Sequence, residues 1–339
     1  MSAADTGAWW ENVPVEERGR NIDNDTTLGL DAWRPLHAHC YSLNVQTPKT
    51  DAEMQRLAAL WNGRRDVELG LWGYATQDFE CLRHFPGLER LNVQCPVIRN
   101  IEGLRHVAAT LKKFDFANTT VRHSLRPVAG CLQLESVHLQ RHNKDFNALH
   151  ALTRLRHLGL SGISLPDLSA LLPFENTLES LFLGFCKPLD FGLLGRLNKL
   201  EALHFLKINK LSEVSALNLA RNLKRIELQW LPHVEVLPDL SELSQLEEVE
   251  IESMKSLRDI SSIAKAPALR FLGLWDCKSL TPQSFECLIR HPALKRLNYG
   301  VGRLKDNEAI EAMFPETMTQ SVRYRIMPGT WLRRPTSSD

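Results

Sequence analysis

The side chains best suited to chemistry in this chain are carboxylates and aromatic rings in three short segments between residues 225 and 275. The segments read RIELQ, EVEIE and FLGLW. Apolar residues occupy their second and fourth positions, and a strand places alternate side chains on opposite faces. The remaining positions therefore share one face, and they are Arg225, Glu227, Gln229, Glu248, Glu250, Glu252, Phe271, Gly273 and Trp275. Carboxylates favour a basic ligand and aromatic rings often anchor protein interfaces, so we predict a docking face for a protein with a basic surface patch.

Glu248, Glu250 and Glu252 form a run of like charges on one predicted strand, and two explanations are open. A charge run is commonly just a solvated face. Like charges this close also repel, and that cost is easier to explain if a basic partner docks there. We assign three further residues to the same docking face: Trp230, Phe182 and His204. Trp230 lies one position past its strand and is predicted at the rim.

Three histidines are predicted on the same face of the middle segments: His138, His157 and His204. They are either ordinary polar residues or, because imidazole titrates near neutrality, groups that make binding sensitive to pH. An enzyme whose site is assembled from several segments, with a metal held by these histidines, is the least favoured alternative.

No residue spacing in the sequence indicates a catalytic, metal or cofactor site. The pairs Cys81/His84 and Cys287/His291 contain possible zinc ligands, but a zinc site requires four converging ligands. Neither a GxxxxGK phosphate loop nor a GxSxG nucleophile motif occurs. We therefore predict a protein that is not an enzyme, with no catalytic residue, no metal and no cofactor.

The elements that position these residues come from a repeat. The pattern leucine-x-x-apolar-x-apolar recurs ten times from Leu88 to Leu294, and the first leucines are 21 to 25 residues apart. Two weaker copies precede it, around Leu43 and Leu69. A period of this length predicts a solenoid with one short strand per coil. Between the strands, apolar residues three apart predict 3₁₀-helices or short α-helices, and residues 212–222 and 283–291 look more helical than the others.

From Leu88 to about Gly302 the chain resembles the leucine-rich-repeat superfamily, in its short-coil, internalin-like or phosphatase-regulator-like branch. The resemblance implies an α/β solenoid: a right-handed arc with a concave parallel β-sheet, a convex side of 3₁₀ and short helices, and a cap at each end. It also implies that proteins bind on the concave face. One departure is that the column after the strands is mostly apolar, as in Ile208, Leu231 and Met254, so the asparagine ladder of many members is absent.

Three parts are predicted along the chain. Residues 1–39 form an N-terminal cap or, alternatively, a binding arm rich in tryptophan. Residues 40–303 form the solenoid. Residues 304–339 form a C-terminal cap and tail, with a short helix over 308–318 and a strand over 321–327.

Composition bounds the function. The net charge of +1 argues against nucleic-acid and membrane-surface binding, and seven scattered cysteines without a signal segment favour a reducing, cytoplasmic location. We predict a protein-binding solenoid that is a monomer when free. Two biological roles fit this prediction. The first is a bacterial immunity-type inhibitor of a toxic enzyme. The alternative is an effector or adaptor delivered to another cell, where it binds a host protein.

Overall fold

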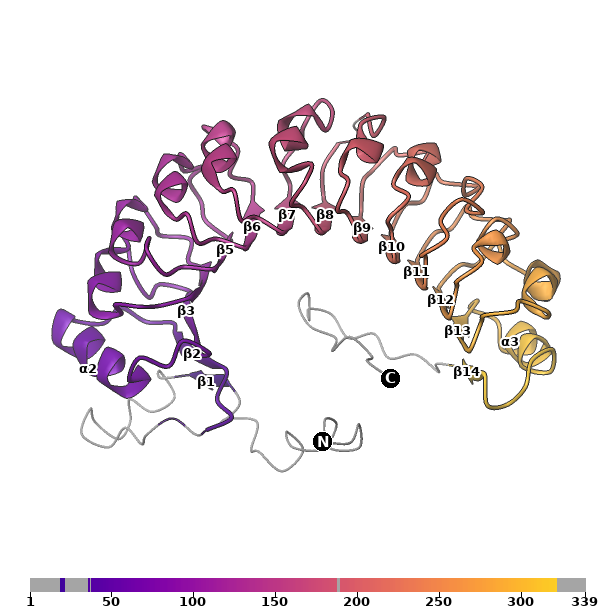
Figure 1. Cartoon of the computed structure of the whole chain (residues 1–339). Helices are drawn as coiled ribbons and strands as arrows, with labels where there is room; N and C mark the ends of the chain where they lie inside the picture. Colours follow the sequence, from indigo (N-terminus) through magenta and orange to yellow (C-terminus); the bar gives the residue numbers. More distant parts are fainter. Residues whose placement is uncertain (1–18, 22–35, 37, 188–189, 322–339) are drawn as a thin grey trace. The chain divides into compact units, whose positions relative to one another are not determined.

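The computed structural model describes residues 19–21, 36, 38–187 and 190–321. The described residues belong to two compact units that divide between Arg154 and Leu155, and each is described by itself. In both units short strands alternate with 3₁₀ segments, and the strands follow one another in chain order (Figure 1). This is the predicted solenoid of one strand per coil.

In the unit that ends at Arg154, parallel strands pair successively. They are β1 (Gly19–Asn21), β2 (Ser42–Val45), β3 (Glu68–Trp72), β4 (Arg90–Gln94), β5 (Lys113–Ala117) and β6 (Ser136–Gln140). The helical segments are α2 (Asp51–Trp61), η4 (Glu80–His84), η5 (Glu102–His106), η6 (Arg126–Gly130) and η7 (Phe146–Ala151). The strand β1 falls in the part predicted as an N-terminal cap; the rest of that part, apart from Leu36, Ala38 and His39, lies outside the described residues.

The unit that begins at Leu155 repeats the arrangement. Its parallel strands are β7 (His157–Ser161), β8 (Ser180–Gly184), β9 (Ala202–Leu206), β10 (Arg225–Gln229), β11 (Glu248–Glu252), β12 (Phe271–Trp275), β13 (Arg296–Gly300) and β14 (Thr319–Ser321). Its helical segments are η8 (Ser169–Phe174), η9 (Leu194–Arg196), η10 (Ser215–Leu219), η11 (Ile263–Lys265), η12 (Pro282–Leu288) and α3 (Leu304–Glu311).

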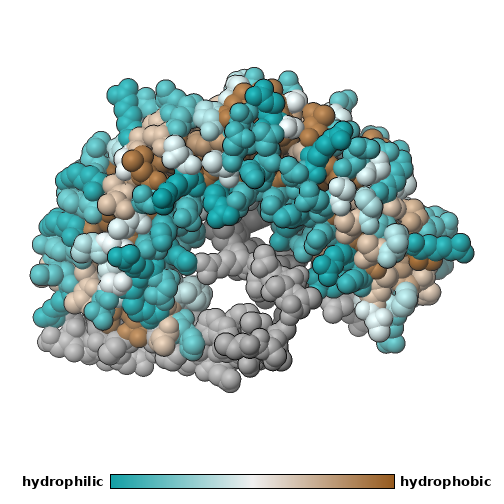
Figure 2. All heavy atoms as spheres, in the orientation of Figure 1, coloured by the Kyte–Doolittle hydropathy of each residue, from teal (hydrophilic) through white to brown (hydrophobic). Residues whose placement is uncertain are grey.

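The core consists of the apolar positions of the repeat. Leu223, Ile226 and Leu228 of one coil are almost fully buried, and so are their counterparts in the other coils. Each coil is too thin to enclose its own apolar side chains, so the neighbouring coils bury them. The side of the described surface seen in Figure 2 is accordingly mainly hydrophilic, with hydrophobic residues in separate patches.

Several local predictions need correction. Residues 51–61 form an α-helix that the leucine pattern did not reveal: Thr50 caps it through a capping box with Glu53, and it buries Met54, Leu57 and Trp61. The two segments that look more helical in sequence, η10 and η12, are 3₁₀-helices. A 3₁₀-helix rises about 2.0 Å per residue against 1.5 Å for an α-helix, so it spans the outer side of a short coil with fewer residues.

The C-terminal elements begin earlier than predicted. The helix α3 starts at Leu304 rather than at residue 308, and it ends before Met313. The strand β14 starts at Thr319 and pairs in parallel with β13. The remainder of the predicted strand, from residue 322, lies outside the described residues.

Backbone hydrogen bonds at the corners just after the strands take the place of the missing asparagine ladder. Most of the residues directly after a strand have positive φ, among them Gly162 (64°), Lys207 (49°) and Ser253 (55°). Their backbone N–H groups donate to the last carbonyl of the next strand, as from Gly162 to Gly184 (2.8 Å) and from Ser253 to Trp275 (2.8 Å). Further bonds of this kind start from Gly73, Phe185, Lys207, Trp230 and Asp276. Backbone groups of adjacent coils thus satisfy one another, and the next column can stay apolar.

The glycine at the corner after β7, Gly162, should be favoured there for its conformation. We expect Gly162→Ala to lower the free energy of unfolding by about 1 kcal/mol, because a Cβ is disfavoured in the left-handed region. Gly130→Ala is the control: Gly130 does not have positive φ, and a Cβ there meets nothing within 4 Å. Urea unfolding of both variants checks this. Equal losses for the two would contradict the conformational explanation.

Two members of this mostly apolar column, Thr119 and His142, are polar. His142 is fully buried, and its ring stacks on Phe116 with 4.1 Å between centroids. Its Nδ1 accepts the backbone N–H of His123 (3.1 Å), and its Nε2 lies 3.1 Å from the hydroxyl of Thr119. An Nδ1 that accepts a backbone proton belongs to a neutral imidazole with its proton on Nε2. Burial, helped by the charges of His123 and Arg141, lowers the pKa of His142 to about 4.

This histidine should make the fold sensitive to acid. The unfolded chain binds the proton near pH 6.5 and the folded chain only near 4, so stability is complete above pH 6.5 and falls as the pH drops through this window. At pH 5 the loss from His142 should be about 2 kcal/mol. Urea unfolding at pH 7 and pH 5 should therefore show a smaller acid loss in His142→Leu than in the wild type. The same acid loss in both proteins would contradict the assignment.

Candidate protein-binding face

The strand register assembles the predicted acidic and aromatic residues on one face of β10, β11 and β12. Arg225 pairs in register with Glu248, and Glu248 with Phe271. The same register aligns Glu227, Glu250 and Gly273, and then Gln229, Glu252 and Trp275. Neighbouring strands are about 4.8 Å apart, so these nine positions form a contiguous grid. We call this side of the sheet, opposite the leucine core, the sheet face.

Arg225 is the centre of the sheet face. Its Nε lies 2.8 Å from Oε1 of Glu227, and its Nη2 lies 2.9 Å from Oε1 of Glu250. Glu248 is 3.6 Å from the same Nε. Burial acts to lower the pKa of Arg225, but the three carboxylates outweigh it and raise the pKa. The repulsion within the glutamate run is thus offset by a cation of the same chain, which is a simpler explanation for that run than an external cation.

A second chain of polar contacts crosses the same face. The side-chain amide of Gln229 donates to Glu252 (3.2 Å), and its oxygen lies 3.1 Å from Nε2 of His204. His204 also lies 3.6 Å from Glu227 through Nδ1 and packs edge-on against Phe182, with 4.9 Å between ring centroids. The residues Phe182 and His204, predicted from the preceding segments, are therefore joined to the grid.

Burial lowers the pKa of His204 to about 4, with Arg225 adding to the effect and the bond to Gln229 opposing it. Burial lowers the pKa of His138 as well. Burial thus argues against titration of His204 near neutrality and moves His138 in the same direction, because removing the ring from water disfavours the imidazolium.

Two predicted site residues are not exposed as expected. Glu250 is only 7% exposed and is held by Arg225. Phe271 is 5% exposed, and the guanidinium of Arg296 on the next strand lies 4.5 Å from its ring centroid. Phe271 is therefore covered by its neighbour and cannot serve as a free aromatic anchor. The sequence shows the face to which a residue points, but not what the adjacent strand places over it.

The two tryptophans differ from Phe271. Trp230 is 50% exposed at the corner after β10, as predicted for the rim. Trp275 is half-buried, and its ring lies over Gly273: a Cβ added to this glycine would be 2.1 Å from the ring. Gly184 carries the ring of Phe182 in the same way, at 2.5 Å. Glycine two positions away thus lets each ring lie along its strand.

A further polar cluster lies on the outward side of β3, β4 and β5, in the other unit, and was not singled out from sequence. Nζ of Lys113 lies 2.7 Å from Glu68 and 2.9 Å from Asp115, and Asn92 donates to Glu68 (3.2 Å). Burial raises the pKa of Asp115, with Lys113 opposing it. Glu68 and Lys113 are two strands apart, so only the assembled register brings them together.

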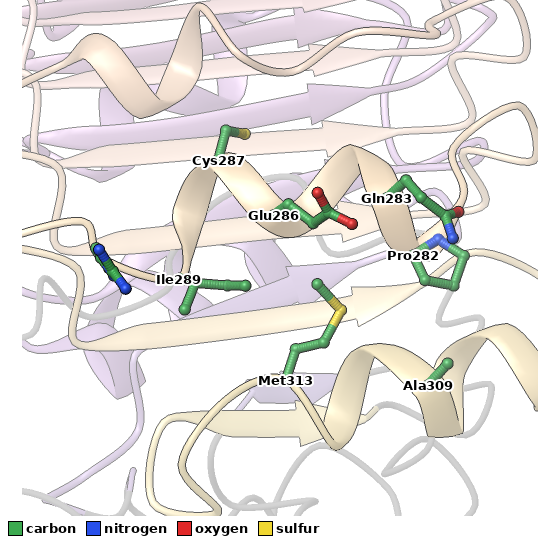
Figure 3. Close-up of a pocket in the computed structure, with 8 residues that line it drawn as sticks. Pro282, Gln283, Glu286, Cys287, Ile289, Ala309 and Met313 are labelled. Carbon is green, nitrogen blue, oxygen red and sulfur yellow. The ribbon is translucent and has the colours of Figure 1, made fainter.

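Other candidate sites offer little chemistry. A pocket of about 580 Å³ is lined by Glu286 and Cys287 of η12, by Ile289 just after it, by Ala309 of α3 and by Met313 (Figure 3). Burial raises the pKa of Cys287, so its thiol is a poor nucleophile. Among the described residues, no group of three or more His, Cys, Asp or Glu side chains is arranged to hold a metal ion. No helix in the described part of the chain is both long and apolar enough to cross a membrane.

Removing the central cation should destabilise the sheet face. We expect Arg225→Leu to lower the free energy of unfolding by about 1–3 kcal/mol, because Glu227 and Glu250 lose their shared partner while partly buried. Adding Glu250→Gln should recover part of the loss. Arg270→Leu is the control, because its pair with Glu247 is long (3.7 Å) and half-exposed, and its loss should stay below about 0.5 kcal/mol. Urea unfolding distinguishes these outcomes; equal losses for Arg225→Leu and Arg270→Leu would be evidence against the network.

No protein-family profile matches the chain, and no curated protein matches it in sequence. Its structure is similar to that of a leucine-rich-repeat protein of Leptospira interrogans, with a TM-score of 0.53, 15% identity, and coverage of 84% of this chain and 72% of that chain. It is also similar to an internalin of Listeria monocytogenes, with a TM-score of 0.50, 17% identity, and coverage of 84% and 87%. Sequence identity this low shows similarity of fold and nothing further. The repeat, the parallel strands and these two likenesses together show a leucine-rich-repeat fold, and the likeness to an internalin agrees with the resemblance predicted from the sequence.

Proposed function

We propose that the protein binds another protein through the sheet face of β9 to β12, and that the surface bound there is basic. Leucine-rich-repeat proteins generally mediate protein binding, which is the context for this proposal. The observation that carries it is the charge of the grid. Its nine positions hold four carboxylates and one guanidinium, so the grid has a net charge of −3. Three of the carboxylates contact that guanidinium, and the fourth, Glu252, contacts Gln229.

The arrangement favours binding because the acids are held in place before a partner arrives. Contacts to Arg225 fix Glu227 and Glu250, and the contact to Gln229 fixes Glu252. Side chains that are already ordered lose less conformational entropy on binding. A basic partner would also be steered by the net negative field, which raises the association rate more than it raises the affinity.

The anchors of this interface are revised from the sequence prediction. The rings of Trp275 and Trp230 are partly exposed to solvent, whereas the ring of Phe271 is buried beneath the guanidinium of Arg296. Tryptophan is the residue type most enriched at interface hot spots. We therefore propose Trp275, Glu248 and Glu252 as the contact centre, with Arg225, Glu227 and Gln229 as the residues that hold the acids.

The biological role that we propose is an immunity-type inhibitor that neutralises a toxic enzyme with a basic surface, in a cytoplasm and without catalysis of its own. All seven cysteines are described and none forms a disulfide, which supports a reducing compartment. The alternative is an effector or adaptor that binds a host protein after delivery. A secretion reporter fused to residues 1–40 separates the two: export favours the effector and retention favours the inhibitor.

The sheet face is tested by charge reversal of its more accessible acids. Glu248→Lys/Glu252→Lys should reduce recovery of a basic partner from the native host by about tenfold or more, because reversed charges repel it. Glu250 is left unchanged because it is buried against Arg225.

Glu286→Lys/Glu308→Lys makes the same change in net charge on exposed helical residues and should leave recovery unchanged. Recovered proteins are identified by mass spectrometry and thermal unfolding checks each fold. Equal recovery by both double variants would place the binding site elsewhere.

A further inference from the structure

The corners after β8, β9 and β10 carry residues that their backbone conformation does not favour. Phe185, Lys207 and Trp230 have φ of 54°, 49° and 55°. Positive φ is unusual for a bulky side chain and costs on the order of 1–2 kcal/mol. Other corners of the same ladder hold Gly162 or Ser253. The two aromatic residues at these corners are therefore not explained by local folding.

Burial does not explain these rings either. Phe185 is 51% exposed and Trp230 is 50% exposed. Instead, they flank a cation: Nζ of Lys207 lies 5.7 Å from the ring centroid of Phe185 and 5.8 Å from that of Trp230. An ammonium between two ring faces is held by cation–π attraction and remains at the surface. The result is an ordered, solvent-accessible arrangement of ring, cation and ring.

The surrounding residues make this edge positive. Lys187 and Lys210 follow the same corners and are exposed. Among the described residues, neither they nor Lys207 takes part in an ion pair. The stretches 185–187, 207–210 and 230–233 contain three lysines and no carboxylate. We call Phe185, Lys187, Lys207, Lys210 and Trp230 the basic–aromatic edge.

We propose that the basic–aromatic edge is a second interaction surface, which binds an acidic segment of a protein that also carries apolar side chains. Carboxylates complement the three lysines, and apolar groups pack on the exposed rings. The proposal does not depend on the sheet face binding a partner, since the edge has the opposite charge and shares only Trp230 with the residues proposed for that face.

A single-stranded nucleic acid is the other polyanion that lysines and rings can hold, because bases stack on aromatic side chains. The geometry favours the peptide. The N–H of Trp230 donates to the carbonyl of Glu252 (2.9 Å), so the edge adjoins the sheet face with its net charge of −3. A continuous phosphate backbone that extends past the edge would meet those carboxylates, whereas a short acidic segment can end before them.

The test uses the full chain and three fluorescent probes at low salt: a 12-residue peptide of Glu, Asp and Leu, its counterpart with Lys in place of the acids, and a 12-nucleotide oligo-dT. Fluorescence anisotropy should show the acidic peptide bound by the wild type and weakened about tenfold in Lys207→Glu. Lys199→Glu is the matched control, since Lys199 is exposed and precedes β9 at the opposite end of the strand. It should bind like the wild type.

Trp230→Gly separates a binding role from a structural one. Glycine adopts positive φ without steric cost, so the variant should unfold at the same temperature as the wild type or at a higher one. It should nevertheless bind the acidic peptide about tenfold more weakly, because the ring is lost. Arg141→Gly, at an exposed corner of the other unit with φ of 65°, should leave binding unchanged.

The proposal is overturned if the acidic peptide does not bind, or if Lys207→Glu binds it no more weakly than Lys199→Glu. A lower unfolding temperature for Trp230→Gly with unchanged binding would make the ring structural. Tighter binding of oligo-dT, with the same loss in Lys207→Glu, would assign the edge to nucleic acid instead.

Discussion

The stacking of one coil on the next in strict register is the constraint on which the rest of this structure depends. A single coil has one strand and at most a short helical segment, and the coil of β10 cannot by itself enclose Leu223, Ile226 and Leu228. Only neighbouring coils bury these residues, and they can do so only if equivalent positions align. The aligned backbone then forms the corner hydrogen bonds, and the outward residues fall into straight columns. The core, the corner hydrogen bonds and the sheet face therefore all follow from the regular spacing of the leucine repeat.

The spacing is also what the sequence reveals best. Ten leucine motifs were enough to predict the strands from β4 to β13, the parallel sheet and the outward direction of Glu227, Glu248 and Glu252. The helix α2 was missed because its signals are a capping box and a spacing of buried residues that differ from those of the repeat. The boundaries of α3 were displaced because a cap follows no repeat.

The candidate site was predictable only in part, because a column shows what points outward but not what lies beside it. Glu250 and Phe271 point outward as expected, yet Arg225 and Arg296 reach across from neighbouring strands and cover them. Both are long side chains that span the distance between strands. The cluster of Glu68 and Lys113 escaped notice for the same reason. These contacts could have been found by searching the aligned outward positions for an arginine or lysine on one strand beside an acidic or aromatic residue on a neighbouring strand.

The corner hydrogen bonds also give the coil stack a direction. At the corners after β7 to β12 the N–H donates to the coil that follows it, as from Trp230 to Glu252 and from Asp276 to Gly300, so these donors face the C-terminal side. After β13 the next acceptor is no longer a strand carbonyl: the N–H of Val301 donates to the side-chain oxygen of Asn307 in α3 (3.0 Å). In the unit that begins at Leu155, the ladder of corner bonds therefore runs in one direction, and its two ends are chemically unlike. An end piece that terminates one side cannot terminate the other, and coils can be gained or lost by duplication only between the two end pieces.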